Sequence, residues 1–483
     1  SAIRLEGEVS LDGGFLQPPE TLLLSPVEDL NVRVSFDPEH VLIHNVSCSL
    51  AGMDFRAAGE LDDEKLRLKI TGRPDIEMTR RVIPMLRDEV RGTGTLELSM
   101  ECVLASSQLR AAILSGTIPP DLSPAITGML RFRGASFAYK EMPSDLHDIQ
   151  GIVTFDQKGL RWNDLNLRCA SSPDCISKGS VDFSAFPVVR IMFFVASPDF
   201  TVDDWRGQWG RDSPSTAAPR PEERDPNIYT LDIDARIVAD KIRFEGLHGR
   251  NAEIGITYRY YPFNHNRLTY EVVNCALYDG KADASGTFTF PEDESFIYTV
   301  TGSFENVDIQ PLLTALRGRQ ENFSGTAEGR ADLMGISGFP ETITGSAEVN
   351  IRDSRILRNM ILQRLGRSVN SRILDDITFP RITSSISFSD GAAHLENTHL
   401  ISPVISLEAS GKVDFSENLD ILCYMAFSQG RLSSLPVVRQ LAWVLKYMGR
   451  LFVKYRITGS LKDPVITTVP FHADEIARFF TRE

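Results

Sequence analysis

Apolar and polar side chains alternate with a period of two along most of this chain. The alternation is unbroken over residues 95–102, 231–237 and 343–351. Because successive side chains of a β-strand point to opposite faces, the pattern predicts strands with one apolar and one polar face. Continuous apolar runs, which are typical of buried parallel strands, are nearly absent, and residues 188–195 are the main exception. The chain is therefore predicted to be mainly β and mostly antiparallel.

A sequence unit recurs four times along the chain. Each copy contains an alternating strand followed by a strand with a shared glycine, at Gly59, Gly179, Gly286 and Gly411. In the first three copies an aspartate then precedes a short helical pattern, at Asp75, Asp199 and Asp308. Aspartate is a good helix N-cap because its carboxylate accepts a backbone N–H of the first turn. The repeats predict a long sheet with short helices between the copies.

The composition of residues 210–227 differs from that of the rest of the chain, since Pro, Ser and charged residues dominate it. Such a segment cannot bury a core, so it is predicted to be a flexible linker or loop. It divides the chain into an N-terminal β region (1–209) and a C-terminal β region (228–483), each with two copies of the unit. Two longer helices are expected in the C-terminal region, near 354–375 and 435–454. They either pack their apolar stripes on the sheet or cap one end of a groove.

The charge of the chain argues against nucleic acid as a partner. Its 483 residues include 65 acidic and 51 basic side chains, for a formal net charge of −14, and phosphate recognition needs a basic surface. The sequence has no apolar run of 18 residues and opens directly into strand-like sequence at Ser1. We expect a fragment of a longer protein whose targeting or anchor segment is absent from this chain.

Motifs for catalysis, metals or cofactors are not found in the sequence. The cysteines and histidines lack metal-ligand spacing, and no nucleophile elbow, P-loop or dinucleotide fingerprint occurs. The chain is therefore predicted to be a non-enzyme without cofactor. Cys169 and Cys175 flank a short loop that would bring two strand ends together, which makes them candidate partners for a disulfide in an oxidising compartment.

Residues 379–415, 455–466 and 307–338 together resemble the C-terminal region of AsmA-like proteins. The resemblance covers roughly residues 227–469 and extends more weakly to the N-terminal half. It implies the properties of the AsmA, TamB and YhdP type of protein, which have an inner-membrane helix at the N-terminus and a β-rich body in the bacterial periplasm. In that family the curved sheet forms an open apolar groove, and the proteins are associated with phospholipid transport toward the outer membrane. On this resemblance the anchor would precede the present chain.

An apolar groove would suit lipid transfer on physical grounds. Exposing two sixteen-carbon chains to water costs on the order of 20 kcal/mol at about 0.8 kcal/mol per CH₂, and a sheet with its apolar face inward would replace the bilayer interior. Phospholipid acyl chains are thus the expected ligand, with inner- and outer-membrane proteins as candidate partners. The candidate groove residues are Leu96, Leu98, Met100, Leu231, Ile233, Ile254, Ile256, Val349, Ile351, Ile386 and Phe388.

Two alternatives remain open at the level of the sequence. The same apolar positions would fill the core of an ordinary β-sandwich if two faces packed against each other. A different function is also consistent with the strands, namely a structural or assembly factor that pairs its strand edges with outer-membrane proteins.

Overall fold

A computed structural model describes most of the chain. The described residues are 6–17, 25–82, 90–115, 124–139, 145–169, 172–203, 230–261, 266–291, 295–318, 322–357, 360–368, 376–403, 405–427 and 451–470. Within them, 78% strand content and 26 strands in one open sheet confirm the prediction of a mainly β protein. The chain forms two compact units, Ser1–Lys241 with Thr257–Pro262 (unit 1) and Ile242–Ile256 with Phe263–Glu483 (unit 2).

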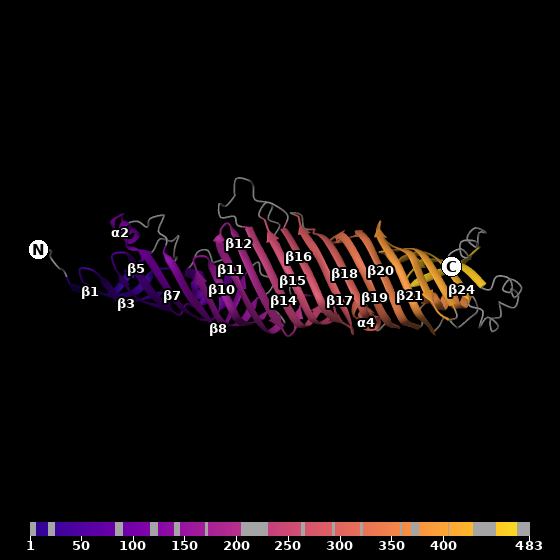
Figure 1. The fold of residues 1–483 in the computed structure, drawn as a ribbon, viewed down its shortest axis with the longest axis horizontal. Helices are drawn as coiled ribbons and strands as arrows, with labels where there is room; N and C mark the ends of the chain where they lie inside the picture. The colour runs from indigo at the N-terminus through magenta and orange to yellow at the C-terminus, as the bar shows by residue number, and fades with distance from the viewer. Residues whose placement is uncertain are drawn as a thin grey trace. The chain divides into compact units, whose positions relative to one another are not determined.

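Unit 1 consists of strands that follow one another in chain order (Figure 1). They are β1 (Gly7–Leu16), β2 (Val27–Phe36), β3 (Val41–Leu50), β4 (Met53–Leu61), β5 (Lys65–Gly72), β6 (Val90–Thr93), β7 (Leu96–Ala105), β8 (Ala125–Tyr139), β9 (Leu146–Asp156), β10 (Gly159–Cys169), β11 (Ser172–Ala185), β12 (Val188–Ser197) and β13 (Phe200–Thr201). Helix α1 (Ile76–Val82) lies between β5 and β6, and α2 (Ser106–Ser115) follows β7. The division between the units falls within β14 (Thr230–Phe244) and β15 (Leu247–Tyr260).

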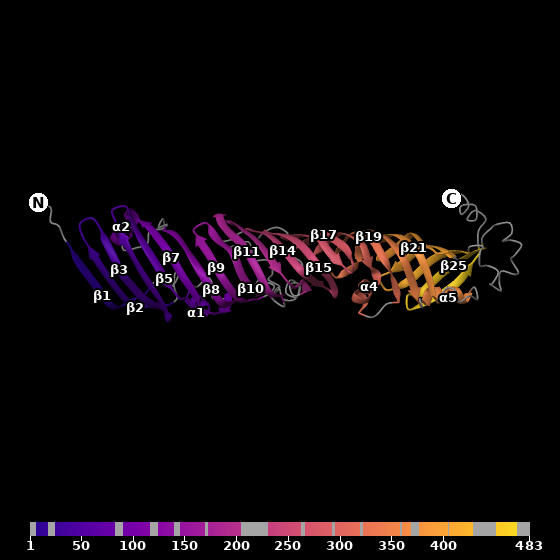
Figure 2. The same cartoon turned by 60° about the horizontal axis from the view of Figure 1, so that its bottom comes forward.

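Unit 2 contains the remaining strands and two helices. The strands are β16 (Asn266–Leu277), β17 (Gly280–Phe290), β18 (Ile297–Asp308), β19 (Phe323–Ile336), β20 (Phe339–Leu357), β21 (Asp376–Ser389), β22 (Ala392–Ile401), β23 (Ile405–Asp414), β24 (Asn418–Phe427), β25 (Leu451–Ser460) and β26 (Asp463–Val469). Helix α4 (Ile309–Arg317) follows β18 and α5 (Met360–Ser368) follows β20. Because β18 and β20 both pair antiparallel with β19, the two helices follow strand ends at the same edge of the sheet, as Figure 2 shows for α4.

Tight hairpin turns are built by aspartate side chains. The Asp37 carboxylate accepts the backbone N–H groups of Glu39 and His40 at 2.8 Å, and Asp62 does the same for Glu64 and Lys65 at 2.8 and 2.7 Å. These backbone hydrogen bonds hold the pKa of both carboxyl groups below the usual value. The turns explain how consecutive strands pair without long connections.

The exceptional apolar run at residues 188–195 has a structural counterpart. Strand β12, which contains it, pairs parallel with β14 from Val188↔Thr230 to Ser197↔Ala239. By contrast, the pairings β1–β2, β11–β12, β19–β20 and β24–β25 are antiparallel. The segment between β12 and β14 includes the predicted linker 210–227, which lies outside the described residues. The predicted division at the linker therefore stays a prediction.

The helix expected near 354–375 was predicted with wrong limits, and most of the helix expected near 435–454 lies outside the described residues. The helix expected near 354–375 begins later, because Ser354 and Ile356 pair with Phe379 and Ile377 at the end of β20, and α5 covers Met360–Ser368. Residues 369–375 lie outside the described part of the chain, as do residues 435–450 of the helix expected near 435–454. The last four residues of that second helix, 451–454, begin strand β25 instead.

Candidate functional site

One face of the sheet in unit 1 is apolar over many strands, and we call it the apolar face. Residues directly opposite each other in neighbouring strands lie on the same face. A single row of opposed residues crosses unit 1 from β7 to β14: Leu98, Leu130, Val153, Trp162, Gly179, Phe193 and Ala235. Alternation along β7 and β14 then places the predicted residues Leu96, Met100, Leu231 and Ile233 on this same face.

The opposite face, which we call the outer face, is mainly polar, although it also carries Met129 and Met192, which are 41% and 55% exposed. Along β7 it presents Glu97, Ser99 and Glu101 between the apolar positions. Glu97 forms an ion pair with Arg133 of β8 at 2.9 Å. The separation of the two kinds of side chain follows from the period-two pattern in the sequence.

The apolar face of unit 1 is only half-buried. All five predicted residues there, including Leu98 and Met100, keep intermediate exposure. Exposure is greatest at β1, where Val9 and Leu11 oppose Val34 and Val32 of β2 and are 60% and 47% exposed. Helix α1 covers part of the face through Ile76, which packs in a small cluster with Leu96 and Phe132 among others. Where α1 does not cover the apolar face, the side chains of this face are accessible to an apolar ligand in the folded protein.

The apolar face of unit 2 is defined by a second row of opposed residues. It crosses β17 to β26 through Ala284, Gly302, Ala331, Ala347, Ile386, Leu395, Gly411, Ile421, Ile457 and Ile466. The predicted residue Ile386 belongs to the row, and Val349, Ile351 and Phe388 lie on the same face by alternation. Ile254 and Ile256 share one face of β15, where Ile254 is buried and Ile256 half-buried. In each unit, the structure thus places the predicted residues of the opposed rows on one face.

The C-terminal strands of unit 2 enclose a filled core. Met425 of β24 is 0% exposed and Tyr455 of β25 is 1% exposed, and both belong to one cluster with Leu362 and Leu365 of α5. The predicted residue Ile351 also lies in this cluster. Over these strands the apolar positions fill a core, as the sandwich alternative expected. Ile386 and Phe388, by contrast, keep intermediate exposure.

A cluster of aromatic rings, absent from the predicted set, lies where β17 ends and β18 begins. We call it the aromatic rim: Tyr270, Phe288, Phe290, Phe296 and Tyr298, whose neighbouring ring centroids are 5.4 to 6.4 Å apart. Register places Phe288 and Tyr298 opposite each other on the apolar face. The signal in the sequence is the two-residue spacing of Phe288 and Phe290 and of Phe296 and Tyr298. Spacing within each strand does not reveal that Phe288 and Tyr298 oppose each other, because that depends on the pairing of β17 with β18.

The expected disulfide between Cys169 and Cys175 is not formed, and all six cysteines are thiols. The register explains why, since Cys169 opposes Ser172 whereas Cys175 opposes Leu167. Diagonal neighbours across a strand pair are about 7–8 Å apart, and a disulfide needs Cα atoms within about 7 Å. Instead, the Cys175 thiol donates to Ser197 Oγ at 3.5 Å, and its burial raises its pKa. A thiol in this state is a poor nucleophile.

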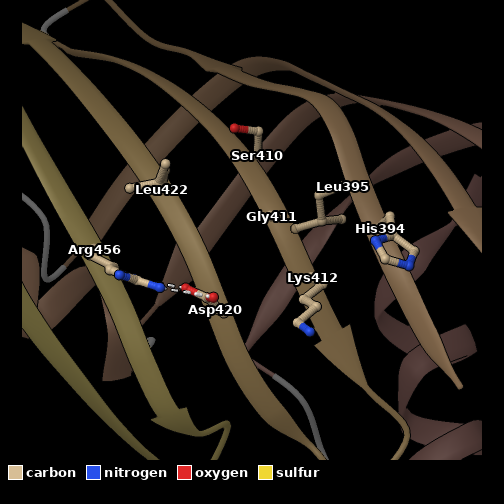
Figure 3. A pocket seen from close by; sticks show the side chains of 8 residues that line it. All are labelled: His394, Leu395, Ser410, Gly411, Lys412, Asp420, Leu422 and Arg456. Carbon is tan, nitrogen blue, oxygen red and sulfur yellow. Dashed lines mark hydrogen bonds and ion pairs between the residues drawn. The ribbon is translucent and has the colours of Figure 1, made fainter. Parts of the chain in front are cut away.

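A depression of about 540 Å³ lies on the outer face of β22 to β25 (Figure 3). His394, Lys412 and Asp420 oppose one another across three strands. Asp420 accepts two hydrogen bonds from Arg456, at 2.9 and 3.1 Å, and this contact holds the pKa of the Asp420 carboxyl below its usual value. Asp420 is thus engaged by a cation, and its carboxylate is the only one lining the depression. The arrangement offers no pair of carboxylates for acid–base chemistry.

Within the described residues, no group of three or more His, Cys, Asp or Glu side chains is arranged to hold a metal ion. A membrane-spanning helix is likewise not found in the described part of the chain, since each helix there is too short or too polar. No family model matches the sequence, and neither a curated protein nor a solved structure is significantly similar to the chain.

Proposed function

We propose that this protein binds phospholipid acyl chains on its apolar face and passes lipid along that face. The observation that carries the proposal is the half-buried apolar face of unit 1. An ordinary sandwich would bury these side chains completely, because each fully buried Leu or Met contributes about 1.5–3 kcal/mol. Leu96, Leu98 and Met100 all keep part of this surface exposed. Acyl chains are the chemistry that would cover it.

The wider context of the proposal comes from the resemblance to AsmA-like proteins. In that context the chain is the periplasmic part of an inner-membrane-anchored protein, and it supports phospholipid transport between the inner and outer membranes through an open groove built from repeats. The proposal requires no catalytic residue, metal or cofactor, because shape and apolar surface are sufficient to carry a lipid.

The alternative function is strand-edge pairing with outer-membrane proteins. The exposed strand β1 favours it, since β1 pairs with β2 on one side, and nine of its ten residues are exposed. Exposed edges of this kind accept a further strand. A delipidated protein that binds an outer-membrane barrel through β1 would support the alternative.

The test of the lipid proposal is a transfer assay with matched variants on the two faces of β7. Met100→Glu places a charge on the apolar face, and Ser99→Glu places the same charge one residue away on the outer face. Fluorescent phospholipid is followed from donor to acceptor vesicles in the presence of each purified protein. We expect transfer by the wild type and Ser99→Glu and its loss in Met100→Glu. Absence of both transfer and extractable phospholipid in the wild type would refute the proposal.

A further inference from the structure

The two ends of the strands in unit 2 differ in chemistry along the apolar face. At one end lies the aromatic rim, with the hydroxyl groups of Tyr270 and Tyr298. At the other end, α4 begins at Asp308, and its first residue Ile309 belongs to the filled core. The same strands thus run from an amphipathic aromatic end to a fully apolar helix-covered end.

Burial increases in the same direction along the strands. Tyr298 and Phe304 keep intermediate exposure, whereas Val307, three residues further along β18, is 0% exposed. On β19, Leu333 near the rim is half-buried, and Ala327 at the α4 end is 1% exposed. On β18 and β19 the side chains near the rim are thus more exposed than those at the α4 end, whereas Leu268 of β16, which opposes Phe288 at the rim, is 6% exposed.

Between the two ends the face carries an uncovered position. The rings of Tyr270, Phe304 and Tyr298 lie over Gly286, Gly329 and Gly335, within 2.9 Å of where each β-carbon would stand. At Gly302, which separates Tyr298 from Phe304 on β18, the nearest atom to that point is the carbonyl oxygen of Asp283, at 3.7 Å. Gly302 is flanked by Ala284 and Ala331 in the register, so no large side chain of these three residues fills the space.

Building on the proposed function, we infer that unit 2 holds a lipid in one orientation, with its polar head group at the aromatic rim and its acyl chains directed over Gly302 toward α4. Tyrosine favours this role because its ring is apolar and its hydroxyl group stays hydrated, as at membrane interfaces. The terminal methyl groups of the chains point toward the α4 end, where the side chains of β18 and β19 are most buried.

The dimensions of the face fit this orientation. Phe304 lies six positions after Tyr298 on β18, and a strand rises about 3.4 Å per residue, which gives roughly 20 Å. The hydrocarbon depth of one membrane leaflet is half of about 30 Å, or roughly 15 Å. An acyl chain aligned with β18 from the rim therefore covers most of the distance to Phe304 and ends before the filled core.

Two photoreactive phosphatidylcholines test the orientation on the purified chain, one with a diazirine in the head group and one with it at the end of an acyl chain. Labelled residues are mapped by mass spectrometry after irradiation. We expect the head-group probe to label residues 288–298 several-fold more than residues 304–313, and the chain-end probe to show the reverse preference. Equal or inverted preferences would overturn the inferred orientation.

The variant Gly302→Leu fills the uncovered position, and Ser303→Leu adds the same side chain on the outer face. We expect loss of chain-end labelling beyond residue 302 in the first variant and wild-type labelling in the second. Labelling confined to unit 1 would overturn this inference and leave the proposed function intact. Labelling of neither unit by either probe would contradict the proposed function itself.

Discussion

Three native cysteines on the apolar face report whether that face is open or filled. Cys48 and Cys102 lie on it in unit 1 with intermediate exposure, whereas Cys423 lies in the filled core of unit 2 and is 3% exposed. Cys102 opposes Leu68 and Ile126, and Cys423 opposes Ala409 and Tyr455, so these thiols have apolar neighbours in both units. The native protein therefore contains both the reporter and its control.

The expected difference in reactivity follows from burial and from the pKa. Burial raises the pKa of Cys423 from 9.0 to about 12. Because only the thiolate reacts, a pKa higher by this amount lowers the reactive fraction about 1000-fold at any pH below both values. Burial raises the pKa of Cys102 as well, but its partial exposure leaves the sulfur accessible to a small reagent.

Timed alkylation of the native protein with iodoacetamide at pH 8, followed by peptide mass spectrometry, measures each rate. We expect Cys48 and Cys102 to react first and Cys423 to react only after denaturation. Phospholipid vesicles should slow Cys48 and Cys102, because acyl chains on the apolar face would cover them. Alkylation of Cys423 in the native state at the rate of Cys102 would refute the assignment of a filled core to the C-terminal strands.

Three further predictions concern stability and charge. Met425→Ala should lower the free energy of unfolding by about 2–5 kcal/mol, as cavity-forming substitutions do. Met100→Ala should lower the free energy of unfolding less, because Met100 is already partly exposed. Denaturant unfolding of both variants measures the difference, and equal losses of stability would contradict the prediction. Asp308→Ala removes the helix N-cap in which Asp308 Oδ1 accepts the backbone N–H of Gln310 at 3.0 Å, so it should destabilise α4 by about 0.5–2 kcal/mol. Hydrogen exchange over Ile309–Arg317 measures this effect. Exchange should be faster in Asp308→Ala than in the wild type and unchanged in Asp308→Asn. Arg456→Gln should raise the pKa of Asp420 toward its usual value. The lowered pKa of Asp420 stabilises the folded state above the ordinary aspartate range, and this contribution is lost as pH falls through the lowered value. The NMR titration curve of Asp420 should therefore move to higher pH in the variant. An unchanged curve would show that Arg456 does not cause the lowered pKa.

The presence of strands and the face on which each side chain lies could be predicted from the sequence, because both depend on the local pattern of apolar and polar residues. Leu96, Leu98 and Met100 alternate with polar residues, and alternation alone decides which face each side chain occupies. The two N-caps with a described contact, Asp75 and Asp308, could also be predicted, since their carboxylates accept the backbone N–H of Met78 and Gln310. These features require no knowledge of distant partners.

Features that depend on distant partners could not be predicted. Whether an apolar face is open or filled depends on what packs on it: Met100 keeps intermediate exposure, whereas Met425 belongs to the cluster that includes Leu365 of α5 and is 0% exposed. The limits of α5 depend on the pairing of Ile356 with Ile377, which overrides the helical spacing. The failed disulfide between Cys169 and Cys175 depends on a register shift between Leu167 and Cys169, which the number of intervening residues does not reveal.

The distribution of exposed apolar surface favours lipid binding over strand-edge pairing. An edge partner would engage β1, which offers ten residues of one strand. The half-buried residues of the apolar face extend through β7 to β14 in unit 1, and their side chains point perpendicular to the plane in which an added strand would pair. A strand added at β1 would leave the apolar face uncovered. A ligand that lies on the face and excludes water from several neighbouring strands at once would remove this exposure, and flexible hydrocarbon chains meet that requirement where a single peptide strand does not.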